Sequence, residues 1–266
     1  MKILAIGDPH GNLEKVKQIP LEGVDLILLT GDIGKADLAR QRMFENVKRK
    51  QQGLKELKDD AEYKKAVYNQ IHNSTLDILK YLSRNSSVYS LQGNVGIYSA
   101  AETRKTSEKV GLKLNSTIGE IRKIGNVYLP KNRLRTFDGL RIGFLEYFSD
   151  VSWVKEFKPS DYAKSMKRAE RQTEKAKRVL ERFGKILDIL ICHQPPYGYL
   201  DKVDFPGVPP SWKGKHAGSK AILDYIKKYQ PKYVFCGHIH EGEGKAKIGK
   251  TEIYNLGVAG HKIVNL

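Results

Sequence analysis

The chain has 266 residues, of which 40% are hydrophobic, and its formal net charge is +17. This length and apolar content suffice for one well-packed domain, so we expect residues 1–266 to form a single domain that carries insertions. No apolar run approaches the ~18 residues of a membrane-spanning helix, and the apolar stretch at residues 1–6 is too short for a secretory signal. We therefore expect a cytoplasmic protein without a membrane association.

The only cysteines are Cys192 and Cys236, and each lies inside an apolar run. Such a pair predicts buried, reduced thiols rather than a disulfide or a four-ligand zinc site. The excess of positive charge indicates an anionic partner, but solvated Lys-rich helix faces produce the same excess.

Short apolar runs predict buried strands along the whole chain. They occupy residues 2–6, 25–30, 87–91, 140–145, 187–192 and 232–236. Between them, apolar residues recur three and four positions apart, which predicts helices and hence a layered α/β architecture. Further strands near Val127 and at 252–255 and 262–264 have short connections, so the sheets are expected to be mixed.

Two charged segments have the apolar spacing of long helices. Residues 36–82 predict a helical insertion of two helices, with the turn near Gly53 or at residues 58–60. Residues 160–183 predict another helix, with Ser160 as its N-cap and Gly184 just beyond its end. Both segments are rich in Lys and Arg, but these interleave with Glu and Asp, which favours solvated faces over a nucleic-acid surface.

Residues 195–218 lack any periodicity and predict a long loop. The loop contains four aromatic residues, Tyr197, Tyr199, Phe205 and Trp212. Two interpretations remain open: a lid or wall for a substrate, or a small hydrophobic cluster under the loop.

Five short polar segments each follow directly on a predicted strand. They are Gly7-Asp8-Pro9-His10-Gly11, Gly31-Asp32, Gly93-Asn94, Cys192-His193 and Gly237-His238-Ile239-His240. Ligands of α/β sheets bind in the crevice beyond the carboxyl ends of the strands, so these segments are expected to meet there. The adjacent glycines permit tight turns and a close approach of backbone to an ion or a phosphate.

The side chains in these segments are Asp, His and Asn, a set that suits Mn, Fe, Zn, Co or Ni, with Mn as our first choice. Seven side chains exceed what one ion with an open position needs, which indicates two divalent ions. Asp32 is the natural bridge between them. Such a centre retains positive charge and selects phosphate esters.

At these residues the chain resembles the calcineurin-like metallophosphoesterase superfamily, whose pattern is Asp-x-His, Gly-Asp, Gly-Asn, a lone His and Gly-His-x-His. The motifs occur in the same order from Asp8 to His240. The resemblance implies a four-layer α/β/β/α sandwich of mixed sheets and a metal-dependent hydrolysis of phosphate esters. The helical insertion at about 36–82 lies outside this pattern.

The resemblance also implies a ligand set for each ion. The first ion would be bound by Asp8, His10, Asp32 and His240. The second would be bound by Asp32, Asn94, His193 and His238.

One position departs from the family pattern. Many members have a His directly after Gly-Asn, resembling a general acid for the leaving oxygen, and this chain has Val95 there. His216 in the aromatic loop is our candidate replacement, with His261 and Tyr197 as weaker ones, and an exposed loop imidazole is the alternative for His216. We predict that Asp32, Asn94 and His216 act in catalysis.

The expected function is that of a phosphodiesterase or phosphatase acting on a small or nucleotide-like substrate. Two alternatives stay open: a nuclease acting on RNA or DNA, and a non-catalytic metal-binding scaffold. The basic charge and the aromatic loop favour the first alternative, and Val95 favours the second.

Overall fold

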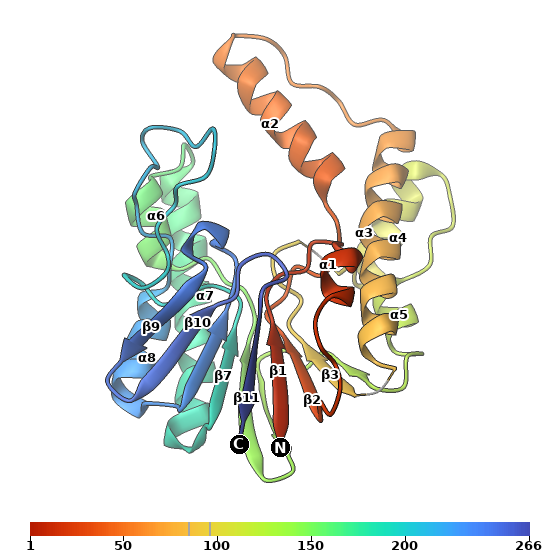
Figure 1. Cartoon of the computed structure of the whole chain (residues 1–266). Coiled ribbons are helices and arrows are strands. Elements are labelled where there is room, and N and C mark those ends of the chain that lie inside the picture. The colour runs from red at the N-terminus through yellow and green to blue at the C-terminus, as the bar shows by residue number, and fades with distance from the viewer. Residues whose placement is uncertain (85, 96) are drawn as a thin grey trace.

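The computed structural model describes residues 1–84, 86–95 and 97–266. Two mixed sheets lie face to face, and helices cover the outer face of each (Figure 1). The expected four-layer α/β/β/α arrangement is confirmed. No helix in these described ranges is long and apolar enough to cross a membrane.

The first sheet has the strand order β11-β1-β2-β3-β4. Its strands are β1 (Lys2–Ile6), β2 (Leu26–Leu29), β3 (Ser87–Ser90), β4 (Val127–Tyr128) and β11 (His261–Asn265). The strands β1 to β4 run parallel, and β11 pairs antiparallel with β1.

The second sheet has the strand order β5-β6-β7-β8-β10-β9. Its strands are β5 (Arg133–Phe137), β6 (Leu140–Leu145), β7 (Ile189–Cys192), β8 (Tyr233–Cys236), β9 (Gly244–Ile248) and β10 (Thr251–Asn255). The central strands are parallel, and β5 and β9 pair antiparallel at the two edges. The sequence analysis missed these edge strands, because their residues are mostly exposed or half-buried and form no apolar run.

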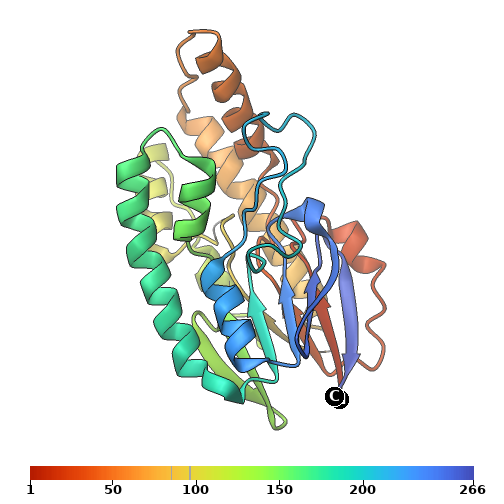
Figure 2. The same cartoon turned by 90° about the vertical axis from the view of Figure 1, so that its left-hand side faces the viewer.

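The helices divide between the two outer faces, and Figures 1 and 2 show them from two sides. The first sheet carries α1 (Leu13–Lys17), α3 (Ala61–Leu82), α4 (Ala100–Val110) and α5 (Thr117–Ile121) on its side; the second carries α6 (Val151–Phe157), α7 (Tyr162–Phe183) and α8 (Lys220–Tyr229). The described ranges also contain two short 3₁₀ helices, at Gly184–Ile186 and His240–Gly242. The sequence analysis missed α1, α4, α5 and α6, which are short or mostly solvated.

Apolar side chains from both sheets pack against one another in a core between the sheets. Ile3, Leu28, Phe144, Ile191 and Phe235 are each completely buried in it. Because strand side chains alternate, the other face of each strand packs under the helices. The two sheets therefore cannot slide apart without exposing apolar surface.

The segment 36–82 has two helices, as expected, separated by residues 52–60. The second, α3, buries seven of its residues, whereas α2 (Asp37–Gln51) buries none and projects away from the sheets (Figure 1). Met43, Phe44 and Val47 are therefore exposed. Local helical periodicity predicted both helices, but only tertiary packing decides which one joins the core.

The expected cap of α7 is wrong. The N-cap residue is Asp161 rather than Ser160, and no side chain there caps the helix. Gly184 ends the helix as predicted, with a φ of 57° that favours glycine.

Residues 195–218 form an irregular loop, pinned by single β-bridges between Pro196 and Ser219 and between Lys202 and His216. Val203 and Ala217 are buried against Phe157 and Ile239, with Trp212 at the edge of this cluster. The loop therefore has the small hydrophobic core that the second interpretation expected.

A matched pair of substitutions tests which layers hold the fold. Phe144→Ala, in the core between the sheets, should lower the free energy of unfolding by about 3–5 kcal/mol because it leaves a cavity. Phe44→Ala removes the same atoms from the 46% exposed face of α2 and should change it by less than about 0.5 kcal/mol. Urea unfolding followed by circular dichroism measures both, and equal losses would contradict this account of the core.

Candidate metal centre

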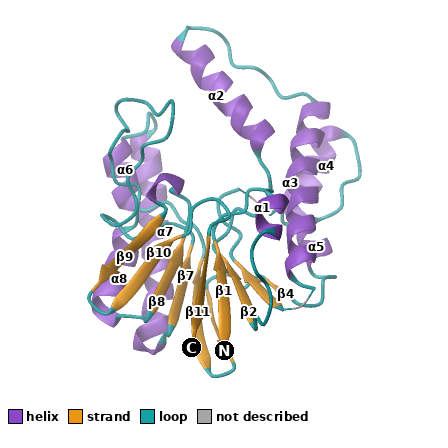
Figure 3. Ribbon diagram, viewed as in Figure 1, coloured by secondary structure: helices purple, strands orange, loops and turns teal. Residues whose placement is uncertain are grey.

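The carboxyl ends of five parallel strands meet at one end of the two sheets (Figure 3). In the first sheet, β1 is followed by Asp8 and His10, β2 by Asp32, and β3 by Asn94. In the second sheet, β7 is followed by His193, and β8 by His238 and His240. The candidate residues from both sheets therefore lie at the same end of the two sheets.

The backbone in these turns adopts conformations that position the side chains. His10, Asp32 and His238 have φ values of 46°, 41° and 68°, which are uncommon for residues with a Cβ. Gly93 and Gly237 pack so closely on Asp32 and Asp8 that a Cβ on either glycine would collide with the carboxylate. These glycines allow the carboxylates to lie against the neighbouring turns.

Asp8 is completely buried and is held by two hydrogen bonds. Thr30 Oγ1 donates to Asp8 Oδ1 over 2.6 Å, and the His238 backbone N–H donates to Oδ2 over 2.5 Å. The second bond joins β1 of one sheet to the turn after β8 of the other.

Asp32 is 3% exposed, and one of its oxygens is already engaged. The backbone N–H groups of Asn94 and Val95 both donate to Oδ1 over 2.7 Å. The other oxygen, Oδ2, lies 3.9 Å from His10 Nε2 and 3.6 Å from His193 Nε2. Asp32 Oδ2 thus lies between imidazoles that come from different sheets.

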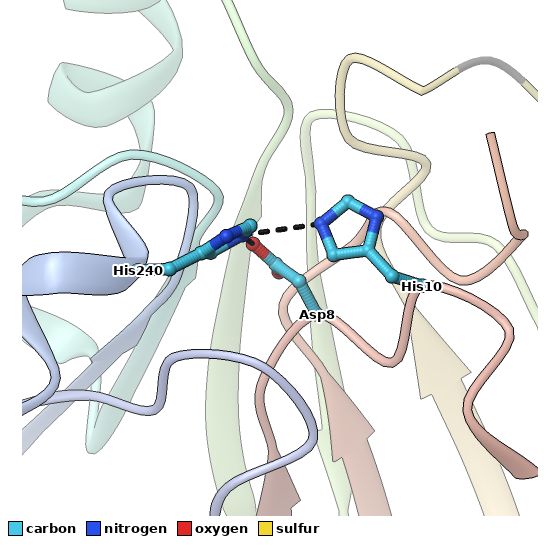
Figure 4. A group of neighbouring side chains, drawn as sticks. All are labelled: Asp8, His10 and His240. Carbon is cyan, nitrogen blue, oxygen red and sulfur yellow. Dashed lines mark hydrogen bonds and ion pairs between the residues drawn. The ribbon is translucent and has the colours of Figure 1, made fainter. Parts of the chain in front are cut away.

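One group of possible metal ligands consists of Asp8, His10 and His240, which Figure 4 shows pointing toward one another. His240 Nε2 lies 3.1 Å from His10 Nε2 and 3.5 Å from Asp8 Oδ2. Two ring nitrogens at this distance need a proton or a cation between them.

A second group consists of Asp8, Asp32 and His193. His193 Nδ1 lies 3.0 Å from the Thr30 carbonyl oxygen, which can only accept, so Nδ1 carries a proton. Nε2 then faces the group and lies 2.7 Å from Asn94 Oδ1. This orientation, with the far nitrogen bonded to a carbonyl, is usual for an imidazole that binds a metal.

His238 belongs to neither group of carboxylates and imidazoles, although it lies beside them. Its ring centroid is 4.9 Å from that of His193 and 5.2 Å from that of Tyr147. The sequence analysis did not identify Tyr147 or Thr30, because neither belongs to a motif of metal ligands.

Burial and mutual charge shift the titration of these groups. Burial and the nearby His193 lower the pKa of His238 to about 3, and burial lowers the pKa of His10. Burial also opposes a charge on His193, but Asp32 and Asp8 outweigh it and raise the pKa of this imidazole. Burial would raise the pKa of Asp8, yet His193 and the hydrogen bonds lower it below its usual range.

The donor set fits divalent metal ions. Two contacts join atoms that can both accept a hydrogen bond: His10 Nε2 with His240 Nε2, and His193 Nε2 with Asn94 Oδ1. Each contact needs a proton between its two atoms, and a bound cation could take the place of that proton. Among the described residues, the only basic groups in ion-pair contact with Asp8 and Asp32 are imidazoles.

The candidate for the general acid lies in the loop 195–218. His216 is partly buried in the aromatic loop, and its Nδ1 lies 2.7 Å from Oδ1 of the buried Asp201. Asp201 also accepts the N–H groups of Gly198 and Gly218, so its position is well defined. The sequence analysis missed Asp201, whose partner lies 15 residues away.

The two weaker candidates are placed differently. Tyr197 donates its hydroxyl hydrogen to Glu156 over 2.6 Å. His261 is an exposed residue at the start of β11.

The profile of the calcineurin-like phosphoesterase family matches residues 1–242. The chain belongs to this family. It is therefore a member of a family of metal-dependent phosphoester hydrolases with a dinuclear divalent metal centre. The recognition made from the five motifs is confirmed.

Similar proteins match over short stretches only. The human metallophosphoesterase domain-containing protein 1 is 36% identical over 84 residues, which are 30% of this chain and 24% of that protein. An uncharacterised protein of Methanocaldococcus jannaschii is 39% identical over 69 residues, which are 25% of this chain and 29% of that protein. The matched stretches thus span less than a third of either relative.

Solved structures share the fold over nearly the whole chain. A phosphopantetheinyl hydrolase from Mycobacterium tuberculosis has a TM-score of 0.55 at 14% identity, covering 97% of this chain and 89% of that one. A dimetal phosphatase from Danio rerio has a TM-score of 0.50 at 13% identity, covering 98% and 88%. At these identities the likeness extends to the fold alone.

Metal content tests the candidate centre directly. Asp32→Asn should reduce the bound metal from about two ions per chain to about one or fewer, because Oδ2 loses its charge between the imidazoles. Asp77→Asn, on the exposed face of α3, is the matched control and should keep the wild-type content. Elemental analysis after loading with Mn and gel filtration measures both, and unchanged content in Asp32→Asn would contradict this role.

Proposed function

We propose that this protein is a phosphodiesterase or phosphatase that acts on a small or nucleotide-like substrate with two divalent ions, of which Mn is the first choice. The observation that supports this most strongly is the meeting of two buried carboxylates with four imidazoles at the ends of strands from both sheets. An electrostatic site of this kind selects a substrate that is both anionic and able to ligate metals.

We assign the ligands as the family resemblance implies. The first ion would be held by Asp8, His10, Asp32 and His240, and the second by Asp32, Asn94, His193 and His238. The free Oδ2 of Asp32, between His10 and His193, supports a bridging role for this residue. Asp8 belongs to both groups of possible ligands and could contact either ion.

Bound divalent ions would lower the pKa of a water molecule and polarise the phosphoryl oxygens. The chain itself supplies orientation. The hydrogen bonds of Thr30 and the Asn94 N–H hold the two carboxylates in place, and Nδ1 of His193 is fixed by a carbonyl. Such preorganisation means that little reorganisation is needed as the reaction proceeds.

Protonation of the leaving oxygen is assigned to His216. Val95 cannot transfer a proton, whereas His216 is oriented by the buried Asp201, which leaves its Nε2 available. The loop 195–218 adjoins the centre, because Asn255 Nδ2 donates both to Leu200 O and to Ile239 O, between His238 and His240. We propose that this loop acts as a lid and brings His216 to the substrate.

We further propose a cytoplasmic location. Cys192 and Cys236 are both free and buried, and burial raises the pKa of each thiol. Neither thiol needs an oxidising compartment.

The activity is tested with a chromogenic phosphodiester and purified protein loaded with Mn, Co, Ni or Zn. We expect turnover with at least one metal, and a loss of kcat/KM of at least about 100-fold in Asp32→Asn but not in Asp77→Asn. Metal bound without turnover of any diester or monoester would indicate the scaffold instead.

The role of His216 predicts a dependence on the leaving group. A general acid contributes about 10²–10⁴-fold, mostly when the leaving oxygen is basic. His216→Gln should therefore lower kcat by about 100-fold for an alkyl phosphodiester but only a few-fold for a nitrophenyl ester.

Asp201 is a positioning residue, and Asp201→Asn should shift the pH profile of kcat for the alkyl ester. A loss in His216→Gln that is equal for both esters would indicate a structural role only. Lys213→Gln, at an exposed residue of the same loop, is the control for disturbance of the loop and should leave kcat unchanged for both esters.

A further inference from the structure

A basic groove leads away from the metal centre along α7. It consists of two adjoining hollows of about 310 and about 830 Å³, which share Lys131, Asn132, Lys175 and Val179 in their walls. Figure 2 looks onto this side of the molecule, where α7 runs past the β5–β6 hairpin.

The smaller hollow adjoins the candidate metal centre. Its wall includes Gly93, which packs on Asp32, and Tyr147, whose ring lies beside those of His193 and His238. A molecule with one phosphate at the centre could therefore extend into the groove.

The walls of the groove are strongly cationic. They contain six basic residues: Lys131, Arg133, Arg168, Lys175, Arg178 and Arg182. Within residues 1–84, 86–95 and 97–266, none of the six has a side chain in an ion pair. Their charge is therefore available to an external anion.

The two acidic residues in the walls are already engaged. Glu146 is 7% exposed and accepts the backbone N–H of Gln92 over 3.0 Å. Glu181 accepts from Lys228 over 3.1 Å and from the Tyr229 hydroxyl over 2.7 Å. Neither acid is paired with a base of the groove.

Three basic residues of α7 form a row along one face of the helix. Arg168, Lys175 and Arg182 are seven residues apart, nearly two turns each, so they follow one face of the helix. The distance from Arg168 to Arg182 along the axis is about 21 Å, the length of about six stacked nucleotides at about 3.4 Å each. A row of this length exceeds what a mononucleotide could contact.

We propose that this groove binds single-stranded nucleic acid and guides one of its phosphodiester bonds to the metal centre. The proposal rests on the proposed function for its chemistry and extends its nucleotide-like substrate to a strand of several nucleotides. The regular anionic charge of a strand matches the cationic row, and the half-buried Tyr147 adds aromatic surface in the smaller hollow. Aromatic side chains reach bases only when these are unpaired, which favours a single strand over a duplex.

Binding is measured without metal, so that it does not depend on catalysis. The probe is a fluorescein-labelled ten-nucleotide oligouridylate in EDTA, with anisotropy recorded between 50 and 200 mM salt. Six phosphate contacts predict a slope of log affinity against log salt of about −4. Affinity should rise with strand length up to about six nucleotides.

Two triple variants, each losing three positive charges, distinguish binding in the groove from a general attraction of RNA to a basic protein. Lys131→Gln, Arg168→Gln and Lys175→Gln together should weaken binding at 50 mM salt by at least about tenfold and reduce the slope by about two. The control combines Lys227→Gln, Lys247→Gln and Lys250→Gln, three exposed residues on α8 and the β9–β10 hairpin. The control should stay within about twofold of the wild type.

A second groove variant tests the same prediction at other residues, in case the first variant does not fold. Arg178→Gln with Arg182→Gln, in the larger hollow, should reduce the slope by about 1.4. Circular dichroism confirms the fold of each variant.

Several outcomes would overturn the proposal: no binding by the wild type, a flat salt dependence, equal losses in the two triple variants, or inorganic polyphosphate competing as well as RNA at equal phosphate. Binding of RNA by a wild type that hydrolyses no ester would instead reject the proposed function. Hydrolysis of the chromogenic diester without RNA binding would reject the groove alone.

Discussion

Two buried carboxylates at the seam between the sheets impose the main constraint on this structure. Asp8 is fully buried and Asp32 nearly so, and an uncompensated charge at such depth is strongly destabilising. Hydrogen bonds from Thr30 and from the turns after β3 and β8 compensate part of this cost. Cations bound between these carboxylates and the surrounding imidazoles would offset the remaining cost of burying the two negative charges.

This constraint links the fold to the chemistry. The core between the sheets holds strand ends of both sheets at one crevice, and the turns after them have little freedom because Gly93 and Gly237 lie against the carboxylates. A site built on strand ends keeps its geometry better than one built on mobile loops. The long loop 195–218 is tied to this frame through Asn255 and has a small hydrophobic cluster of its own, apart from the core between the sheets.

Charge is distributed unevenly over the outside of the molecule. Part of the net positive charge lies along α7, where Lys and Arg side chains without an ion pair in the described ranges face a groove that opens beside Gly93 and Tyr147. On α2 the exposed Met43, Phe44 and Val47 accompany basic residues, and the first turn of this helix lies beside the centre, because Arg40 lines a hollow together with His10. Both basic segments thus adjoin the candidate metal centre, α2 by its first turn and α7 through the groove.

The sequence by itself determined the architecture and the segments that carry chemistry. Six strands were visible as apolar runs, because strands covered on both faces have few polar positions. The order of the motifs from Asp8 to His240 identified the family. These motifs were visible because each one directly follows an apolar run. Local patterns of this kind need no knowledge of distant residues.

Tertiary structure alone decided the rest. The edge strands β5 and β9, the packing of α3 but not α2, and the pairing of His216 with Asp201 all depend on neighbours that are far away in sequence or on solvent exposure. The basic groove likewise arises from residues of α7 that meet Lys131 and Arg133 only in space. Spacing along the chain determines which face of a helix a residue occupies, but not what that face contacts.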